Sequence, residues 1–192
     1  FFRSRKVMDE KLKENEQESL FYDMEMPLIY VLADMEKYGI KVDKDALLAY
    51  QKLLDEQISG MTEEIYALAG EEFNINSPKQ LGEILFDKLG LKGGKKTKTG
   101  YSTKADVLEK LAPNNEIVRD VLEYRTYQKL KSTYCDGISA LVNPETHRIH
   151  SVFHQMGTVT GRLSSSEPNM QNIPTRTELG RELRKMFTAR DG

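Results

Sequence analysis

The chain of 192 residues has no tryptophan, a single cysteine and no long apolar run. The lone Cys135 has no partner for an internal disulfide, which fits a reducing compartment. No apolar stretch approaches the roughly 18 residues of a membrane-spanning helix, and the start Phe1-Phe2-Arg3-Ser4 resembles no secretion signal. These absences predict a soluble, intracellular protein with no membrane partner.

The chain also lacks an excess of charge of either sign, because 28 lysines and arginines stand against 30 aspartates and glutamates. A net charge of -2 means that any nucleic-acid binding must rest on local basic clusters. The 39% hydrophobic and 30% charged content suits long solvated helices with narrow apolar stripes. The chain starts without Met and stops at Gly192 without a closing element, so we expect a piece of a larger protein.

Most of the chain carries apolar residues at the spacing of amphipathic helices. The longest stripe runs over 47–68 and stops at Gly70, and a shorter one over 28–38 stops at Gly39. A glycine in these places can take the left-handed conformation that ends a helix. Further helices are expected over 7–23, 77–89, 102–111, 116–142 and 178–187.

Two helix starts can be placed from their capping residues. Ser77 is expected as the N-cap of a helix with Pro78 at its first position and Gln80 at its third. Ser102 or Thr103 is expected to cap the short helix that follows.

After Pro144 the pattern changes, because the segment 150–155 is short, rich in strand formers and followed by Gly157. We expect a sheet there. The predicted fold class is therefore mainly α with a small β portion, an α+β arrangement.

The loop over 90–104 holds five lysines with hydroxyl residues between them. A phosphate-binding P-loop needs four residues between its first Gly and a Gly-Lys-Ser/Thr, and no register here supplies them. Two interpretations stay open. The lysines can neutralise the phosphates of a long polyanion without reading its sequence, or they form an ordinary solvated loop.

A second basic and hydroxyl-bearing patch lies in the helix expected over 116–142. Arg125, Lys129 and Ser132 lie at spacings of four and three, which brings them onto one side of a helix, and Lys131 and Thr133 lie beside them. These residues can follow one nucleic-acid strand, or they can form a solvated helix face.

Three histidines, His147, His150 and His154, suggest a metal site at first sight. In an extended segment only His150 and His154 share a face, and no cysteine or carboxylate cluster completes a tetrahedral set. Cys135 has no histidine at the spacing of a nucleophilic site. We therefore expect neither a metal site nor a catalytic nucleophile.

The segment over 158–176 constrains function most strongly. It puts two arginines, three serines, two asparagines and a glutamine on a backbone that Gly161, Pro168 and Pro174 keep from being helical. Such a segment is suited to contacting a polar partner.

Several motifs, in order along nearly the whole chain, resemble the bacterial DNA polymerase I family, which is family A of the DNA polymerases. The block over 160–174 carries the strongest resemblance. The matching segments are Phe73–Gly82, Lys95–Thr103, Leu122–Arg125, Lys129–Tyr134, Thr160–Pro174, Gly180-Arg181 and Leu183-Arg184.

The resemblance implies a domain plan. Residues 1–23 would be the last helix of a 3′–5′ exonuclease-like domain, 24–42 a palm helix, 43–143 the thumb and 144–192 the start of the palm. Long antiparallel thumb helices would carry the lysine-rich loop at their tip, and the palm sheet would be incomplete. The catalytic aspartates and the fingers helix of the family would lie beyond Gly192.

The resemblance also implies roles for individual residues. Arg162 would contact the minor groove at the primer terminus, helped by Asn169, Gln171 and Asn172, and Arg176 would lie near the template or the incoming nucleotide. A minor-groove donor suits a copying enzyme, because acceptors there occupy nearly the same place in every correct pair. The implied phosphate contacts are Ser77, Lys79, Lys95, Lys96, Lys98, Ser102, Thr103, Lys104, Arg125, Lys129, Lys131, Ser132 and Thr133.

The implied function is DNA-directed DNA synthesis in replication and repair, with this chain holding primer-template duplex. Family members use two metal ions, so Mg²⁺ is expected for the parent enzyme and no cofactor for this chain. The dNTP would bind only to the full-length enzyme, which we expect to be a monomer near the bacterial nucleoid in the cytoplasm. Two alternatives stay open, a non-catalytic DNA-binding module and a helical protein-interaction domain.

Overall fold

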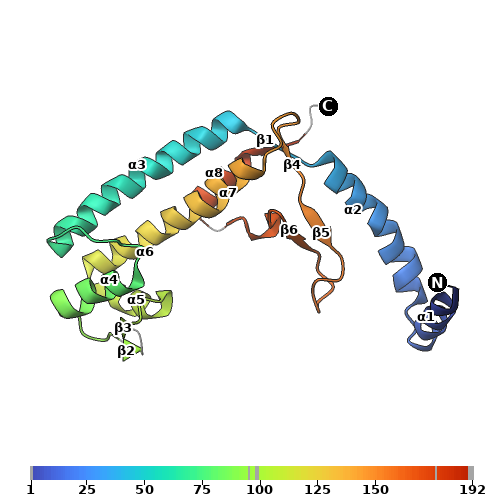
Figure 1. Ribbon diagram of the computed structural model, residues 1–192, viewed down its shortest axis with the longest axis horizontal. Helices are drawn as coiled ribbons and strands as arrows, with labels where there is room; N and C mark the ends of the chain where they lie inside the picture. Colours follow the sequence, from blue (N-terminus) through green and yellow to red (C-terminus); the bar gives the residue numbers. More distant parts are fainter. Residues whose placement is uncertain (1, 95, 98–99, 176, 190–192) are drawn as a thin grey trace. The chain divides into compact units, whose positions relative to one another are not determined.

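A computed structural model describes residues 2–94, 96–97, 100–175 and 177–189 (Figure 1). It divides into two compact units, Phe1–Lys44 with Ile138–Gly192 (unit 1) and Asp45–Gly137 (unit 2). Helices dominate both units, and the strands are short and antiparallel, which confirms the predicted fold class. No helix among the described residues combines the length and apolar character needed to cross a membrane.

Unit 2 is a pair of long antiparallel helical segments with shorter helices at one end (Figure 1). Gln51 near the start of the first long helix bonds Asp136 at the end of the second, at 3.0 Å. The elements are α3 (Lys44–Ala69), α4 (Pro78–Gly82), η2 (Glu83–Lys88), β2 (Lys96–Thr97), β3 (Gly100–Tyr101), α5 (Ala105–Leu111), η3 (Ala112–Asn114), α6 (Glu116–Lys129) and η4 (Leu130–Asp136).

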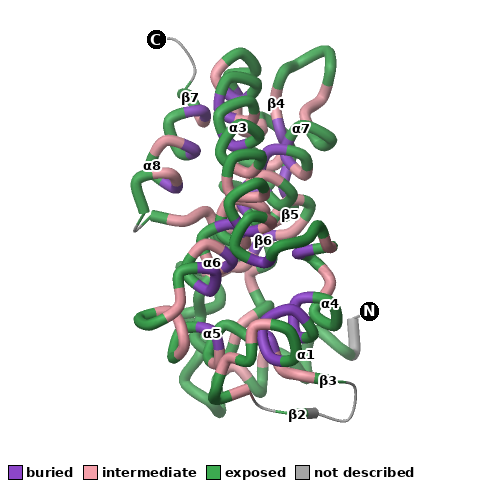
Figure 2. Tube along the Cα trace, turned by 90° about the vertical axis from the view of Figure 1, so that its left-hand side faces the viewer, coloured by how far each residue is buried: buried purple, intermediate pink, exposed green. Residues whose placement is uncertain are grey.

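The core of unit 2 lies where the short helices pack against the ends of α3 and α6. Most of its residues lie within the helices that the sequence predicts, whereas Ala69 and Ile75 lie outside them, and the buried residues gather around α4, α5 and α6 in Figure 2. Burial of these faces removes apolar surface from water and leaves the polar faces of the helices outside. The buried members are Ile65, Ala69, Ile75, Leu81, Ile84, Leu85, Phe86, Leu108, Ile117, Val118, Val121 and Tyr124.

Unit 1 is built around a three-stranded antiparallel sheet in the order β4-β1-β7 and a separate β5-β6 hairpin. The strand expected within 150–155 is confirmed as β5. The elements are α1 (Phe2–Glu14), η1 (Leu20–Glu25), α2 (Met26–Tyr38), β1 (Ile40–Val42), α7 (Gly137–Leu141), β4 (Arg148–Ile149), β5 (Val152–His154), β6 (Ser164–Ser166), η5 (Met170–Asn172), α8 (Glu178–Lys185) and β7 (Phe187–Thr188).

The helix expected over 7–23 is interrupted. α1 ends at Glu14, Asn15 caps it by donating from its side chain to the Lys11 carbonyl at 2.8 Å, and Glu16 takes a positive φ of 56°. Helical structure resumes only afterwards, in η1. Charge composition alone cannot reveal such a break, because the residues on both sides are good helix formers.

The two predicted helix starts have different outcomes. Ser77 is the N-cap of α4, as predicted, and accepts from the Gln80 N–H at 3.4 Å. The prediction for α5 is wrong, because its N-cap is Lys104, which provides no side-chain cap. Thr103 instead accepts a hydrogen bond from Arg125 of α6.

Gly39 ends α2 and allows the backbone of this turn to lie close to β4 in unit 1. Its φ is 65°, and its N–H donates to the Met35 carbonyl at 2.9 Å. A Cβ at this position would lie 2.6 Å from the Ile149 carbonyl oxygen and 2.9 Å from the His150 ring. Both the backbone conformation and the contact with β4 therefore require glycine.

We expect Gly39→Ala to lower the free energy of unfolding by about 1 to 3 kcal/mol, because alanine is strained at positive φ and has no room there. The matched control is Gly60→Ala in α3, where nothing lies within 4 Å of the added Cβ. That change should raise the free energy by about 0.5 to 1 kcal/mol. Urea unfolding of both variants measures the difference, and equal effects would contradict the assignment.

Candidate nucleic-acid interface

The lysine-rich loop of unit 2 packs against the core through Tyr101. The Tyr101 ring packs on Phe86 with 4.8 Å between centroids, and the exposed Lys96 ammonium lies 5.2 Å from the Tyr101 ring centroid. Strands β2 and β3 pair antiparallel, with Lys96 opposite Tyr101. Lys95 and Lys98, two of the predicted phosphate contacts, lie outside the described residues.

Gly82 of α4 and Gly94 of the loop let the loop approach the continuous helix formed by α4 and η2. A Cβ on Gly94 would lie 2.6 Å from the Phe86 ring, and one on Gly82 would lie 3.2 Å from the Tyr101 Cβ. Both ends of the hairpin are therefore packed against the same helix.

The segment 102–104 follows the hairpin and divides its side chains between the inside and the outside. Thr103 is buried, and both its carbonyl and its hydroxyl accept from Arg125, the hydroxyl at 3.2 Å from Nη2. Burial lowers the pKa of Arg125. Lys104 is exposed and Ser102 half-buried, so these two side chains face outward.

α4 lies beside this segment, because it contacts β3 and a Cβ on its last residue, Gly82, would lie 3.8 Å from Thr103 Cγ2. Lys79 is exposed and lies 4.0 Å from Glu83. The loop before α4 is tied to α6 by a bond from Asn76 Nδ2 to the Tyr124 hydroxyl at 3.1 Å. Gln80 Oε1 accepts from the Asn74 N–H at 2.7 Å.

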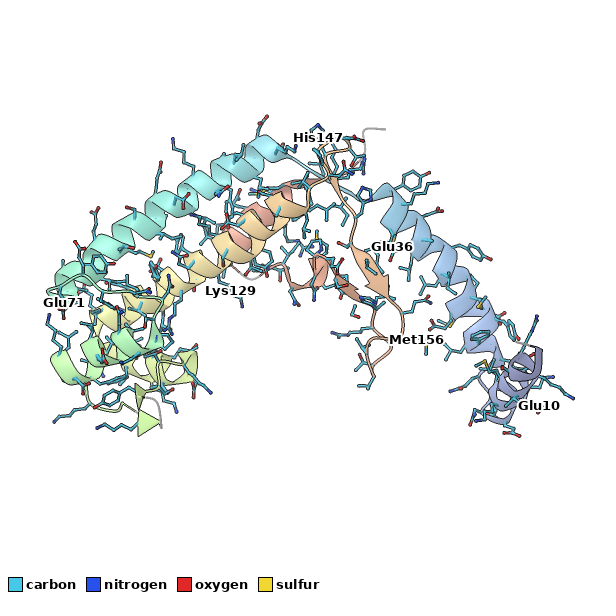
Figure 3. The ribbon with its side chains drawn as sticks, viewed as in Figure 1. Glu10, Glu36, Glu71, Lys129, His147 and Met156 are labelled. Atoms are coloured by element: carbon cyan, nitrogen blue, oxygen red, sulfur yellow. The ribbon has the colours of Figure 1, made fainter. Side chains whose placement is uncertain are left out.

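The patch along α6 and η4 divides in the same way. Lys129, labelled in Figure 3, is exposed, as are Ser132 and Thr133. Lys131 instead donates to Asp55 of α3, and this bond raises the pKa of Lys131. The structure thus leaves three of the predicted contacts facing outward and gives Arg125 and Lys131 partners within unit 2.

In unit 1 the predicted minor-groove residues lie on and after the β5-β6 hairpin. Asn169 is the N-cap of η5 and accepts from the Gln171 N–H at 3.0 Å. Gln171 Nε2 donates to the Leu163 carbonyl at 2.7 Å. Arg162 and Asn172 are exposed, and Thr158 donates to the Arg162 carbonyl at 2.7 Å.

The structure therefore brings Arg162, Asn169, Gln171 and Asn172 onto one short, internally bonded segment. Arg176, the remaining predicted residue of this group, lies outside the described residues.

Sequence reasoning missed the residues that hold this hairpin against η1 and α2. Glu36, labelled in Figure 3, accepts from the Phe153 N–H at 2.7 Å through Oε1. Gln155 Nε2 donates to Glu25, to the carbonyl at 3.0 Å and to Oε2 at 2.8 Å. More than one hundred residues separate the partners in sequence, so no local pattern indicates them.

The side chains of His150 and His154 lie against polar groups of the fold, and Cys135 is buried. His150 Nδ1 lies 2.8 Å from the Glu36 carbonyl, and His154 Nε2 lies 2.9 Å from the Ser166 hydroxyl. Within the described ranges no group of three or more His, Cys, Asp or Glu is placed to hold a metal ion. Burial raises the pKa of Cys135 to about 11, so its thiol stays protonated near neutral pH.

Ser165 fixes the turn that carries Asn169. Its buried hydroxyl accepts from the Met170 N–H at 3.1 Å and lies 3.5 Å from Asn169 Oδ1. We expect Ser165→Ala to cost about 1 to 3 kcal/mol of unfolding free energy, because the Met170 N–H loses its acceptor.

Ser151 gives a matched control. Its hydroxyl is buried, and it has no hydrogen-bond partner among the described residues. Ser151→Ala should be neutral or stabilising, because it removes an unsatisfied polar atom. Thermal unfolding compares the two, and a larger loss for Ser151→Ala would contradict the assignment.

Residues 44–192 match the family described as DNA polymerase family A, and the chain belongs to that family, which confirms the resemblance read from the sequence. It is similar to DNA polymerase I of Geobacillus stearothermophilus, with 56% identity over 181 residues, 94% of this chain and 20% of that protein. DNA polymerase I of Bacillus subtilis (strain 168) is 51% identical over 183 residues, 95% of this chain and 21% of that protein.

A solved structure with a similar fold is the POL domain of Pol1 from M. smegmatis, in complex with DNA primer-template and dNTP. The TM-score is 0.83 at 42% identity, covering 96% of this chain and 32% of that one. The chain thus spans about a fifth of the length of the curated relatives it matches.

Proposed function

We propose that the chain is the part of a template-directed DNA polymerase that grips primer-template duplex. The observation that carries the proposal is the set of exposed cationic and hydroxyl side chains on the rooted tip of unit 2 and on one face of α6 and η4. The solved relative that resembles this chain holds primer-template DNA and dNTP, which supports the same partner here.

The proposed contacts in unit 2 are to phosphates. Phosphate contacts position a protein on a duplex without reading its sequence, which is what an enzyme that copies any template requires. Four residues of α-helix advance by about 6 Å, so Lys129 and the hydroxyls one turn further can follow one strand. The residues proposed for this role are the exposed Lys79, Lys96, Lys104, Lys129, Ser132 and Thr133 and the half-buried Ser77 and Ser102.

The proposed contacts in unit 1 are to the minor groove at the primer terminus. Arg162 is exposed on a segment that Ser165, Asn169 and Gln171 hold by internal hydrogen bonds. A donor carried on a backbone held in this way can test whether the last pair has the correct geometry while ignoring its identity. Asn169, Gln171 and Asn172 would support Arg162 there.

In this proposal 43–143 acts as the thumb, 24–42 and 144–192 as parts of the palm, and 1–23 as the end of an exonuclease-like domain. The parent enzyme would work in DNA replication and repair, as a monomer near the bacterial nucleoid in the cytoplasm. Its Mg²⁺ ions would need carboxylate ligands, and the described residues offer no such cluster. As the resemblance implies, we assign the catalytic residues, the Mg²⁺ ions and the dNTP to the full enzyme rather than to this chain.

Binding of the chain to a labelled primer-template duplex should weaken steeply as salt rises, because phosphate neutralisation releases counterions. Lys129→Gln should lower the slope of log K against log salt by about 0.9, the value for one lost phosphate contact. Fluorescence anisotropy from about 50 to 200 mM salt measures both. Lys52→Gln, an exposed lysine of α3 outside the proposed interface, is the matched control and should leave the slope unchanged.

The same titration separates the alternatives. Salt-independent or undetectable binding would contradict the proposed grip and favour a helical protein-interaction domain. Primer extension by the complete gene product separates a polymerase from a non-catalytic binding module, because only the polymerase extends.

Arg162→Ala in the complete gene product should slow extension of a matched primer by about tenfold, because one good base-edge contact is worth roughly 1 to 3 kcal/mol. It should also reduce the ratio between matched and mismatched extension. Single-turnover primer extension measures both rates. Arg5→Ala, which removes an exposed arginine of α1, serves as the control, and an Arg162 variant with unchanged kinetics would remove Arg162 from this role.

A further inference from the structure

Arg125 lies on α6 beside the lysine-rich tip, yet its guanidinium is directed inward. Two of its nitrogens donate to one residue, Nη1 to the Thr103 carbonyl and Nη2 to the Thr103 hydroxyl. The two residues are 22 positions apart in sequence. No carboxylate of the described residues forms an ion pair with Arg125, so its charge is carried by these two bonds to neutral oxygens and by the solvent.

Thr103 lies at the junction between the hairpin and α5. On one side Tyr101 packs on Phe86 and approaches Gly82, which holds the hairpin. On the other side Lys104 begins α5 without a side-chain cap. The Arg125 fork is thus the side-chain bond that ties this junction to α6, and it fixes the backbone on either side of Thr103.

We propose that Arg125 is a positioning residue, which binds Thr103 and thereby aims Lys104 at the duplex backbone, rather than a phosphate contact itself. This inference rests on the proposed function of unit 2. It differs from the direct phosphate contact that the resemblance implies for Arg125. A planar fork with two parallel donors suits the Thr103 carbonyl and hydroxyl, and a lysine at this position cannot make both bonds in that geometry.

The test uses the salt dependence of duplex binding by the 192-residue chain, measured by fluorescence anisotropy. Lys104→Gln should lower the slope of log K against log salt by about 0.9, as the loss of one phosphate contact. Arg125→Lys should lower the slope by the same amount, although it preserves the charge, because Lys104 is no longer aimed. The double variant should lose about 0.9 in total rather than about 1.8.

A direct contact gives the opposite pattern. Arg125→Lys would then keep a slope near that of the unchanged chain, and Arg125→Gln combined with Lys104→Gln would lose about 1.8. Either result overturns the proposal. Lys129→Gln is the control for independence, because its effect should add to that of Arg125→Lys.

Variants of Thr103 test the same proposal without changing Arg125. Thr103→Val removes the hydroxyl acceptor at nearly constant shape and should lower the slope in the direction of Arg125→Lys, whereas Thr103→Ser keeps the acceptor and should restore binding. Circular dichroism confirms that each variant is folded, and if Arg125→Lys is unfolded, the Thr103 pair decides. Equal slopes for Thr103→Val and Thr103→Ser overturn the proposal.

Failure of the proposed function looks different from failure of this inference. If the unchanged chain shows no salt-dependent duplex binding, the grip itself is wrong and the role of Arg125 falls with it. If the unchanged chain binds with a steep slope and Arg125→Lys has no effect, only the positioning role is wrong.

Discussion

Unit 2 depends on the burial of one apolar cluster at the end of its long helices. Phe86 belongs to that cluster and also carries the Tyr101 ring, so the same side chain that closes the core holds the lysine-rich hairpin. Gly82 and Gly94 allow the hairpin backbone to lie close to α4 and η2. The tip is therefore fixed by packing at both ends. The exposed Lys96 and Lys104 lie on this fixed part of the chain.

The net charge of the chain is a poor guide to its binding surface. Several cations are paired with carboxylates of unit 2, as Lys131 is with Asp55 and Lys88 with Glu71 at 2.8 Å. Others, such as Lys129 and Lys104, are exposed. The sum over all residues is near zero although the outward-facing part of the tip is basic, which is why local clusters carry the proposed role.

The sequence was sufficient for the features that depend on neighbours along the chain. The helical stripes of α3 and α6, the Ser77 cap and the glycine at 39 all follow from local spacing and backbone preference, and all are confirmed. The direction of Arg125 and the bond from Phe153 to Glu36 could not be predicted, because tertiary packing selects partners far apart in sequence. The prediction for the cap of α5 was wrong for the same reason, because Thr103 is bonded to Arg125 of α6.

The two kinds of proposed contact require different degrees of rigidity, and the two units are built accordingly. Charge attraction persists over a Debye length of about 8 to 10 Å, so an exposed lysine needs its backbone held near the duplex but does not need one fixed side-chain geometry. A minor-groove hydrogen bond tolerates only a few tenths of an ångström around its optimum length. In the proposed roles, the segment bearing Arg162 would need the bonds through Ser165, Asn169 and Gln171 that hold its backbone, whereas the lysines of unit 2 would need only a fixed backbone beneath them. Arg125 is consistent with this difference, because its two hydrogen bonds to Thr103 help to hold the backbone that carries Lys104.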